Sequence, residues 1–254
     1  MHLVGRRVVR DSRPRVVGYP RTERLMDAEH LAAWRGLLRT GMWAAWGGVA
    51  LIAVQMGVFL TSPPPGTTAD FYELLIDDPV LGALSLDALY VLSNTFAYLV
   101  YLALGVLLWR TSRSAVVVAL ALGTLGMAAY MASPRFVEML SLAHTYADAD
   151  ADERVALLAT GDGMLATWTG TAFDVYYVFN AALLVIMAVL LLRSRVTSRA
   201  TGWWAMAAAV LMMVPSNVGV VGLVFAVASL VPWVVFSVLL ALRLQVLTRE
   251  PADV

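Results

Sequence analysis

The residues best suited to chemistry are two carboxylates that fall in or beside apolar segments. Asp174 stands in "GTAFDVYYVFNAALLVIMAVLLLR" (170–193), and Asp87 stands near the start of another apolar run. A carboxylic acid in such surroundings can protonate an alkene or an epoxide, and neighbouring aromatic rings can stabilise the resulting cation. Asp174 and Asp87 are therefore the candidate catalytic residues if the chain is an enzyme.

Polar side chains recur along two apolar segments at the spacing of one helix face. In the segment 84–109, polar residues follow one another at intervals of three or four from Asp87 to Tyr101. A second line of residues at the same spacing runs into the segment 168–192, and we call each such line a polar stripe. Its members are Thr167, Gly170, Thr171, Asp174 and Tyr177. Polar stripes on membrane helices face the interior of the bundle, so we predict a polar vestibule between these helices. The predicted ligand-binding residues are Asp174, Tyr177, Thr171, Asp87, Tyr90, Asn94, Tyr98, Tyr130 and Trp168.

A second interpretation is that these groups only hold the helices together. Polar side chains commonly hydrogen-bond across membrane helices, and each contributes about 1 kcal/mol. This interpretation is favoured for Asn94, Tyr98 and the threonines, and Asp87 could equally be a solvated residue at a helix start. Asp174 is the better functional candidate, because an intramembrane carboxylate without an arginine partner is costly.

Composition excludes several kinds of chemistry. The chain has no cysteine, so disulfides and thiolate chemistry are excluded, and it has no lysine, so Schiff-base chemistry is excluded too. Its three histidines are scattered, and no nucleotide-binding or hydrolase motif is present. We expect no metal site, no cofactor and no nucleic-acid partner.

Long apolar runs predict an all-α integral membrane protein with a bundle of about six transmembrane helices. With 60% hydrophobic and 14% charged residues, the chain is unlike a soluble domain. The final apolar run, 202–242, would make a helix about 60 Å long, so it must fold back at "MMVPSNVG". The predicted spans are 41–60, 84–109, 115–133, 168–192, a short one at 202–215, and the remainder to 242.

Arginine placement predicts the orientation of these spans. Sixteen of the eighteen basic residues fall in the N-terminal arm, two links and the C-terminal tail, and two fall on the opposite side. By the positive-inside rule, both termini are cytoplasmic. Abundant Ala, Val, Leu and Gly, with Arg in place of Lys, indicate a bacterial genome and hence a bacterial inner membrane. The predicted domains are an Arg-rich arm with an amphipathic helix (1–39), the bundle (40–244) and a tail (245–254).

The outward connection 134–167 is too long to be a turn. In "FVEMLSLAHTYA" the apolar residues Phe136, Met139, Leu140 and Ala143 share one face. This pattern predicts an outer interfacial helix between the third and fourth spans. A further helix should follow it, with Asp152 as the expected N-cap.

Counting from the cytoplasmic arginines gives the depth of the polar groups. At 1.5 Å per helical residue, Asp174 lies about 28 Å above Arg193, and Asp87 lies about 34 Å above Arg110. Because the hydrocarbon core is about 30 Å thick, both residues fall in the outer leaflet or at its rim. The predicted vestibule therefore faces outward, above apolar inner halves of the helices.

The wording of three segments is similar to a known family. "DPVLGALSLDALYVLSN", "GMAAYMASPRFVEMLSLAHTYADADADERVALLATGDGML" and "WTGTAFDVYYVFNAALLVIMAVLLLRSRVTSRATGWWAM" together resemble a bacterial multi-pass membrane family catalogued as domain of unknown function 4386. The resemblance covers about residues 75–243. It implies the span count and topology given above, and it supplies no activity.

Three functions fit these residues. The first is a non-enzymatic accessory protein that binds membrane lipid, a small amphiphile or an isoprenoid in the vestibule; packing motifs such as "GTLG" (123–126) would allow a homo-oligomer. The second is a membrane-embedded enzyme of terpene-cyclase type that uses a carboxylic acid as proton donor. The third is a small transporter, which the lack of a midplane carboxylate disfavours.

Overall fold

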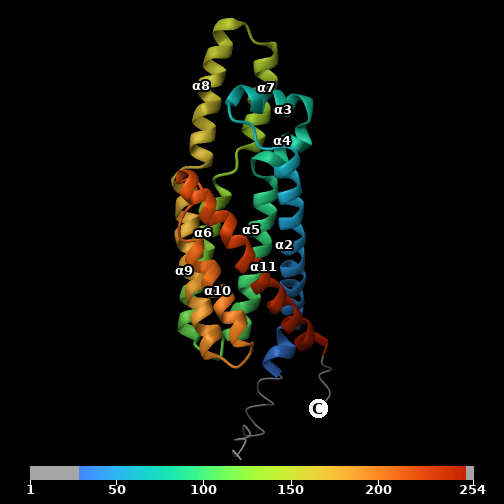
Figure 1. Cartoon of the computed structure of the whole chain (residues 1–254), viewed down its shortest axis with the longest axis vertical. Coiled ribbons are helices and arrows are strands. Elements are labelled where there is room, and N and C mark those ends of the chain that lie inside the picture. Colours follow the sequence, from blue (N-terminus) through green and yellow to red (C-terminus); the bar gives the residue numbers. More distant parts are fainter. Residues whose placement is uncertain (1–28, 250–254) are drawn as a thin grey trace, which may run out of the picture.

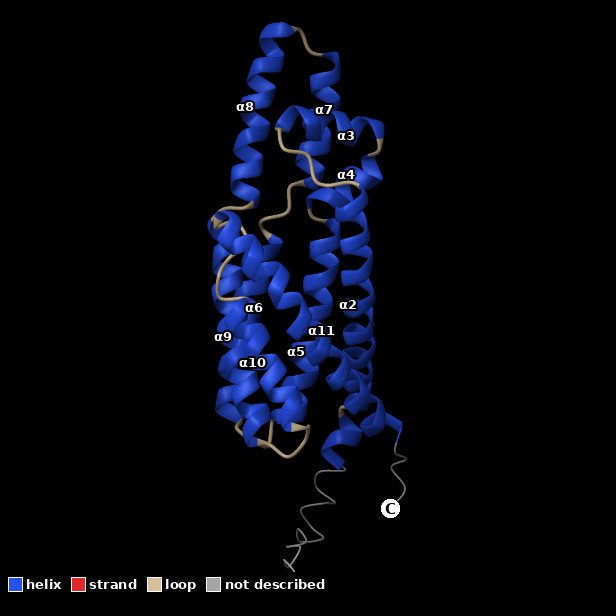
Figure 2. Ribbon diagram, viewed as in Figure 1, coloured by secondary structure: helices blue, strands red, loops and turns tan. Residues whose placement is uncertain are grey.

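The computed structural model describes residues 29–249, and every regular element in that range is a helix (Figures 1 and 2). A short helical stretch at 29–33 precedes the first complete helix. The helices are α2 (Arg35–Thr61), α3 (Thr68–Asp77), α4 (Pro79–Leu86), α5 (Ala88–Leu108), α6 (Arg113–Met131), α7 (Phe136–Asp148), α8 (Ala151–Trp168), α9 (Thr171–Arg193), α10 (Arg199–Leu211) and α11 (Gly219–Arg249).

Five helical stretches in the described range are long and apolar enough to cross a membrane, which indicates a multi-pass membrane protein. They contain α2, α5, α6, α9 and α11. The remaining predicted span, 202–215, corresponds to α10, which ends at Leu211. Its 13 residues reach about 20 Å at 1.5 Å per residue, which is less than the core thickness of about 30 Å. The chain then continues as a non-helical connection, 212–218, to the start of α11.

The long helices and α10 form a closed ring. In the order α2, α5, α6, α9, α10, α11, each helix packs on the one before it, and α11 packs on α2. The connections after α5 and α9, the start of α2 and the end of α11 lie together at one end of the bundle (Figure 1). We call this the arginine end, because Arg35, Arg110, Arg113, Arg193 and Arg199 lie there.

The half of the ring nearer the arginine end is filled by apolar side chains. Leu104 and Leu108 of α5, Leu184 and Met187 of α9, and Phe236 of α11 are all buried in one cluster. Burying apolar side chains of this size against each other excludes water and ions from the interior. The predicted apolar floor is therefore present in the structure.

The "GTLG" segment packs inside the chain. A Cβ atom at Gly123 would lie 2.2 Å from Leu183 Cδ1, and one at Gly126 would lie 3.1 Å from Phe179 Cβ. Both glycines thus serve the close approach of α6 to α9 of the same chain. The two glycines are therefore explained by packing inside the chain, and a homo-oligomer stays a prediction.

The two connections at the far end form a helical cap of α3, α4, α7 and α8 (Figure 1). The predicted apolar face of α7 is present, with Met139 and Ala143 fully buried, and it packs on Phe71, Tyr72 and Leu75 of α3. The α3 and α4 helices were not predicted. A position for α7 at a membrane interface stays a prediction.

Two helix starts differ from the predicted ones. The α8 helix is capped by Asp150, whose carboxylate accepts from the backbone N–H of Glu153 at 3.0 Å, so the choice of Asp152 was wrong. The α2 helix begins at Arg35, inside the segment 1–39 assigned to the arm. The predicted amphipathic helix, from about residue 23 to 39, begins outside the described residues. In its described part, Leu31 packs on the core and His30 Nε2 lies 3.2 Å from the carbonyl oxygen of Val106.

Candidate functional site

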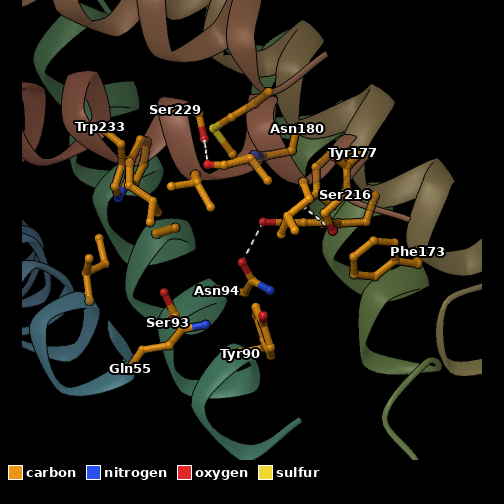
Figure 3. Close-up of a pocket in the computed structure, with 18 of the residues that line it drawn as sticks. Gln55, Tyr90, Ser93, Asn94, Phe173, Tyr177, Asn180, Ser216, Ser229 and Trp233 are labelled. Atoms are coloured by element: carbon orange, nitrogen blue, oxygen red, sulfur yellow. Dashed lines mark hydrogen bonds between the residues drawn. The ribbon is translucent and has the colours of Figure 1, made fainter. Parts of the chain in front are cut away.

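A cavity of about 310 Å³ lies inside the ring, in the half nearer the cap. Helices α2, α5, α9 and α11 and the 212–218 connection all contribute to its wall (Figure 3). Its volume is at the lower end of the range of small-molecule sites, about 300–1,000 Å³. The polar residues that line it are Gln55, Tyr90, Ser93, Asn94, Tyr101, Tyr176, Tyr177, Asn180, Ser216 and Ser229.

Two hydrogen bonds join different elements across this wall. The Tyr176 hydroxyl donates to Asn94 Oδ1 at 2.5 Å and so links α9 to α5. The Tyr177 hydroxyl donates to Ser216 Oγ at 3.1 Å and links α9 to the 212–218 connection (Figure 3). Each bond fixes a ring and a small polar group at a defined position. The wall is therefore preorganised rather than collapsed on itself.

The aromatic rings of the wall support one another. Tyr176 and Tyr177 meet edge to face with centroids 5.8 Å apart, and Tyr101 meets Trp233 in the same way at 5.9 Å. Phe173 packs on Tyr177 at 4.9 Å. Ring pairs in these geometries are attractive beyond their buried area, and they present both ring faces and hydroxyl groups to the cavity.

The hydroxyl of Tyr101 is enclosed at the inner side of the cavity. The residue is 2% exposed, and its hydroxyl makes no hydrogen bond of good geometry, with the Asn180 side chain as its polar neighbour. A buried polar group left unpaired costs about 1–3 kcal/mol. A polar atom inside the cavity would remove that cost.

All of the polar groups that line the cavity are uncharged. The residues that contribute to its wall are apolar, aromatic, amide or hydroxyl residues, and no acid, base or histidine is among those described there. This composition does not supply a proton donor of ordinary acidity. It does supply hydrogen-bond donors and acceptors beside flat apolar surfaces.

The cavity opens to the side of the bundle past α11. Leu223 and Val227, one turn apart, both line it and are 57% and 48% exposed. Figure 1 shows α11 crossing the bundle obliquely, from the cap end near α9 to the arginine end near α2. In a membrane, the exposed apolar side chains at this opening would face lipid.

Three of the predicted ligand-binding residues line the cavity: Tyr90, Asn94 and Tyr177. Asp174 does not. It lies one turn nearer the cap, and its Oδ1 accepts a hydrogen bond from Asn217 Nδ2 at 2.9 Å. Of the α9 stripe, Tyr177 reaches the cavity, but the carboxylate of Asp174 lies beyond it and holds the 212–218 connection instead.

Asp87 is also outside the cavity, and it is not a solvated helix-start residue. It is 3% exposed, and its Oδ2 accepts from the backbone N–H groups of Arg135 at 2.5 Å and Phe136 at 3.0 Å. Burial raises its pKa above the usual value, and the two N–H groups partly oppose that rise. Asp87 therefore joins the start of α5 to the start of α7.

The remaining predicted residues have other contacts. The Tyr98 hydroxyl pairs with Thr124 Oγ1 at 2.7 Å, which joins α5 to α6 outside the cavity. Tyr130 is buried behind the wall, with its ring 5.0 Å from that of Tyr176. Thr171 is exposed at the start of α9, and the Trp168 carbonyl accepts from Ser133 Oγ at 2.5 Å. None of these side chains lines the cavity.

Sequence reasoning missed the contributions of α2 and α11. Gln55 is the strongly polar side chain of an otherwise apolar span, which was a usable signal. Asn180 continues the α9 stripe three residues after Tyr177, and it could have been found by the same spacing. Ser229 and Trp233 carried no signal, because α11 is apolar all round and its pattern does not show which face is inside.

Among residues 29–249, no cluster of three or more histidine, cysteine or acidic side chains could hold a metal ion. Comparison with protein-family models, with curated proteins and with solved structures finds no match for this chain. The fold and site alone define its class: a helical, multi-pass bundle with a neutral, aromatic-walled cavity that opens to its side.

Proposed function

We propose that the protein resides in a bacterial cytoplasmic membrane and binds one lipid or small amphiphile in this cavity, in a non-enzymatic accessory role. The observation that carries the proposal is the combination of a polar, aromatic wall with an opening lined by Leu223 and Val227. An amphiphile fits both features, since its head can bind the wall while its tail leaves through the opening into lipid.

The cavity belongs to the outer leaflet in this proposal. Placing the arginine end in the cytoplasm follows the positive-inside rule, and the cap is then outside. Tyr177 is sixteen residues before Arg193 on α9, or about 24 Å along the helix. In a core about 30 Å thick, that height is in the outer half, so a ligand would enter from the outer leaflet.

A terpene-cyclase-type enzyme is less well supported. The aromatic wall suits a carbocation, but the reaction needs an acid that touches the substrate. Asp174 and Asp87 do not line the cavity, and each accepts hydrogen bonds elsewhere. The resemblance to a family of unknown function names no activity, so it adds nothing to either alternative.

One observation favours a transporter as a second candidate. The 212–218 connection is non-helical at the height of the cavity and contributes Met212 and Ser216 to its wall. Irregular backbone at membrane depth is characteristic of transporter binding sites. The apolar cluster below the cavity offers no continuation toward the arginine end, which is why we place binding before transport.

A cavity-filling variant tests the proposal. Ala226 lines the cavity, and Ala228, two residues along the same helix, is exposed away from it. Protein purified from its membrane would be analysed by native mass spectrometry and by extraction of bound lipid. We expect Ala226→Phe to reduce bound amphiphile at least about tenfold, and Ala228→Phe, an equal change in volume, to leave it unchanged.

Two results would overturn the proposal. One is wild-type protein that carries no amphiphile beyond bulk lipid. The other is equal occupancy in wild type and Ala226→Phe, which would show that any bound lipid lies outside the cavity.

A further inference from the structure

The charge of the cavity wall indicates which amphiphile it accepts. Phosphate and carboxylate groups are bound by arginine, lysine or helix N-termini. No basic side chain among the described residues lines the cavity, and the side chain of Arg135 in the cap is held by Thr167 and by the carbonyl groups of Ala132 and Pro134. An anionic head in this cavity would be desolvated without a counter-charge, which is strongly unfavourable.

The wall instead suits neutral oxygen atoms. Gln55, Asn94 and Asn180 carry amides, each of which offers donors and an acceptor. The unpaired hydroxyl of Tyr101 can donate to a carbonyl or accept from a hydroxyl. The residue lines the cavity but is 2% exposed and its hydroxyl is enclosed, so a ligand contacts the hydroxyl by displacing the neighbouring side chains, and bulk water does not reach it.

The shape of the wall favours a ring. Tyr101 and Trp233 meet at the inner side, and Phe173 and Tyr177 meet at the side nearer the cap. Aromatic side chains attract other flat rings through stacked or edge contacts. A volume of about 310 Å³ holds a ring-sized head, and the tail must then leave past Leu223 and Val227.

We propose that the cavity selects an uncharged amphiphile whose ring-sized head carries carbonyl or hydroxyl groups, and that it excludes charged lipids. This proposal rests on the proposed function and specifies its ligand class. Quinones and ring alcohols both have such a head, so the experiment must distinguish these two classes of ligand.

Four probes with the same decyl tail make that distinction: decyl-benzoquinone, para-decylphenol, decylbenzene and decyl phosphate. Their affinities for the full-length protein in detergent would be measured by competition against the co-purified amphiphile. We expect the quinone, the phenol or both to bind at least about tenfold more tightly than decylbenzene and decyl phosphate. Preference for the quinone identifies a carbonyl ligand, and preference for the phenol identifies a hydroxyl ligand.

A matched pair of variants locates the polar contact. Tyr101→Phe removes this hydroxyl at nearly constant volume, and it should fold because the hydroxyl has no hydrogen bond of good geometry to lose. We expect it to weaken the preferred probe about fivefold to tenfold and to leave decylbenzene unchanged. Tyr98→Phe, on the same helix with its hydroxyl on Thr124 outside the cavity, should change neither.

The outcomes separate this inference from the proposed function. If decyl phosphate binds as tightly as the quinone and the phenol, and if this binding is lost in Ala226→Phe, the proposed ligand class is overturned. The proposal that the cavity binds an amphiphile would still stand. Equal affinity for all four probes would also overturn the ligand class. Failure of all four to compete would overturn it as well, and absence of any co-purified amphiphile would overturn both proposals.

Discussion

Asn217 joins the 212–218 connection to the start of α9 through its carboxamide, which donates to Asp174 Oδ1 at 2.9 Å and to the carbonyl oxygen of Thr169 at 2.7 Å. Ser216, the neighbouring residue, lines the cavity and pairs with Tyr177. The carboxylate that first suggested chemistry therefore acts through another residue. It positions one wall of the cavity without touching its interior.

Asn217→Ala should loosen this wall, because it removes both hydrogen bonds. We expect a loss of about 1 kcal/mol in stability, modest because the site is partly exposed, together with faster amide exchange across 212–219. Hydrogen–deuterium exchange in detergent measures the second effect directly.

Asp174→Asn is the matched control, since an asparagine oxygen can still accept from Asn217. We expect near wild-type exchange and unchanged occupancy of the cavity. A large loss of bound amphiphile in Asp174→Asn, with the connection still protected from exchange, would contradict the positioning role and restore Asp174 as a ligand-binding residue.

The close approach of α11 to the same connection gives a second prediction. A Cβ atom at Gly222 would lie 2.2 Å from the carbonyl oxygen of Pro215 and 3.1 Å from the carbonyl carbon of Ser216, both backbone atoms that cannot rotate away. Gly222→Ala should therefore displace the connection, lower stability by about 1–3 kcal/mol and reduce cavity occupancy. Thermal unfolding and lipid extraction measure the two effects.

Gly57 in α2 provides the comparison for that substitution. A Cβ atom there would have nothing within 4 Å, so Gly57→Ala should be neutral or stabilising by about 0.5–1 kcal/mol. Equal unfolding temperatures for Gly222→Ala and Gly57→Ala would show that the connection is free to move, contrary to its packing on α11.

Much of the bundle could be predicted from the sequence because its signals are local. The length of the apolar runs identified the long helices, and "MMVPSNVG" was the available place for the chain to fold back. The rotation of α5 and α9 followed from polar spacing, which is why Tyr90, Asn94 and Tyr177 were found. A stripe gives the inward face of a helix only approximately, however, and it does not give the height at which the interior is open. Asp174 lies nearer the cap than the cavity does, and Tyr98, between the lining residues Asn94 and Tyr101, is turned toward Thr124 of α6.

The remaining parts depend on long-range packing. The apolar α11 helix has no preferred face in its pattern, and its oblique path across the bundle decides where the cavity opens. The α3 helix acquires its role by covering Met139 and Ala143 of α7, a pairing between segments more than sixty residues apart. The sequence left open whether Asp87 is solvated, because its partners, the N–H groups at the start of α7, are brought to it by the same packing.

Asp87 should contribute less to stability as the pH rises. Burial raises its pKa above the usual value of 3.8, so the unfolded chain releases this proton at a lower pH than the folded protein. Stability from this group is therefore lost as the pH rises from about 4 through the folded pKa. The unfolding temperature of the wild type, relative to that of Asp87→Asn, should therefore be higher at pH about 4 than at pH about 7.

The Asp87→Ala variant tests the hydrogen bonds at the same position. It removes the acceptor for the N–H groups of Arg135 and Phe136 at every pH, and we expect a loss of about 1–3 kcal/mol. In the pH series, a wild-type advantage in unfolding temperature over Asp87→Asn that grows as the pH rises would contradict the expected loss of stability, because folding would then favour the charged carboxylate.

Tyr72 should make the cap sensitive to alkaline pH. Its ring is fully buried, its hydroxyl donates to the Leu157 carbonyl oxygen at 2.9 Å, and burial, followed by the charge of Asp162, raises its pKa from 10.0 to about 12. Between these values the unfolded chain is ionised at Tyr72 and the folded protein is not, so stability falls as the pH rises.

Tyr72→Phe lacks this ionisation and, at neutral pH, should cost about 1 kcal/mol for the lost hydrogen bond. The wild-type advantage in unfolding temperature over Tyr72→Phe should thus be present at pH about 9 and shrink or reverse by pH about 11. Other buried tyrosines titrate in both proteins and cancel in the difference, so a constant advantage across that range would show that Tyr72 is not shielded by α7 and α8 as the structure describes.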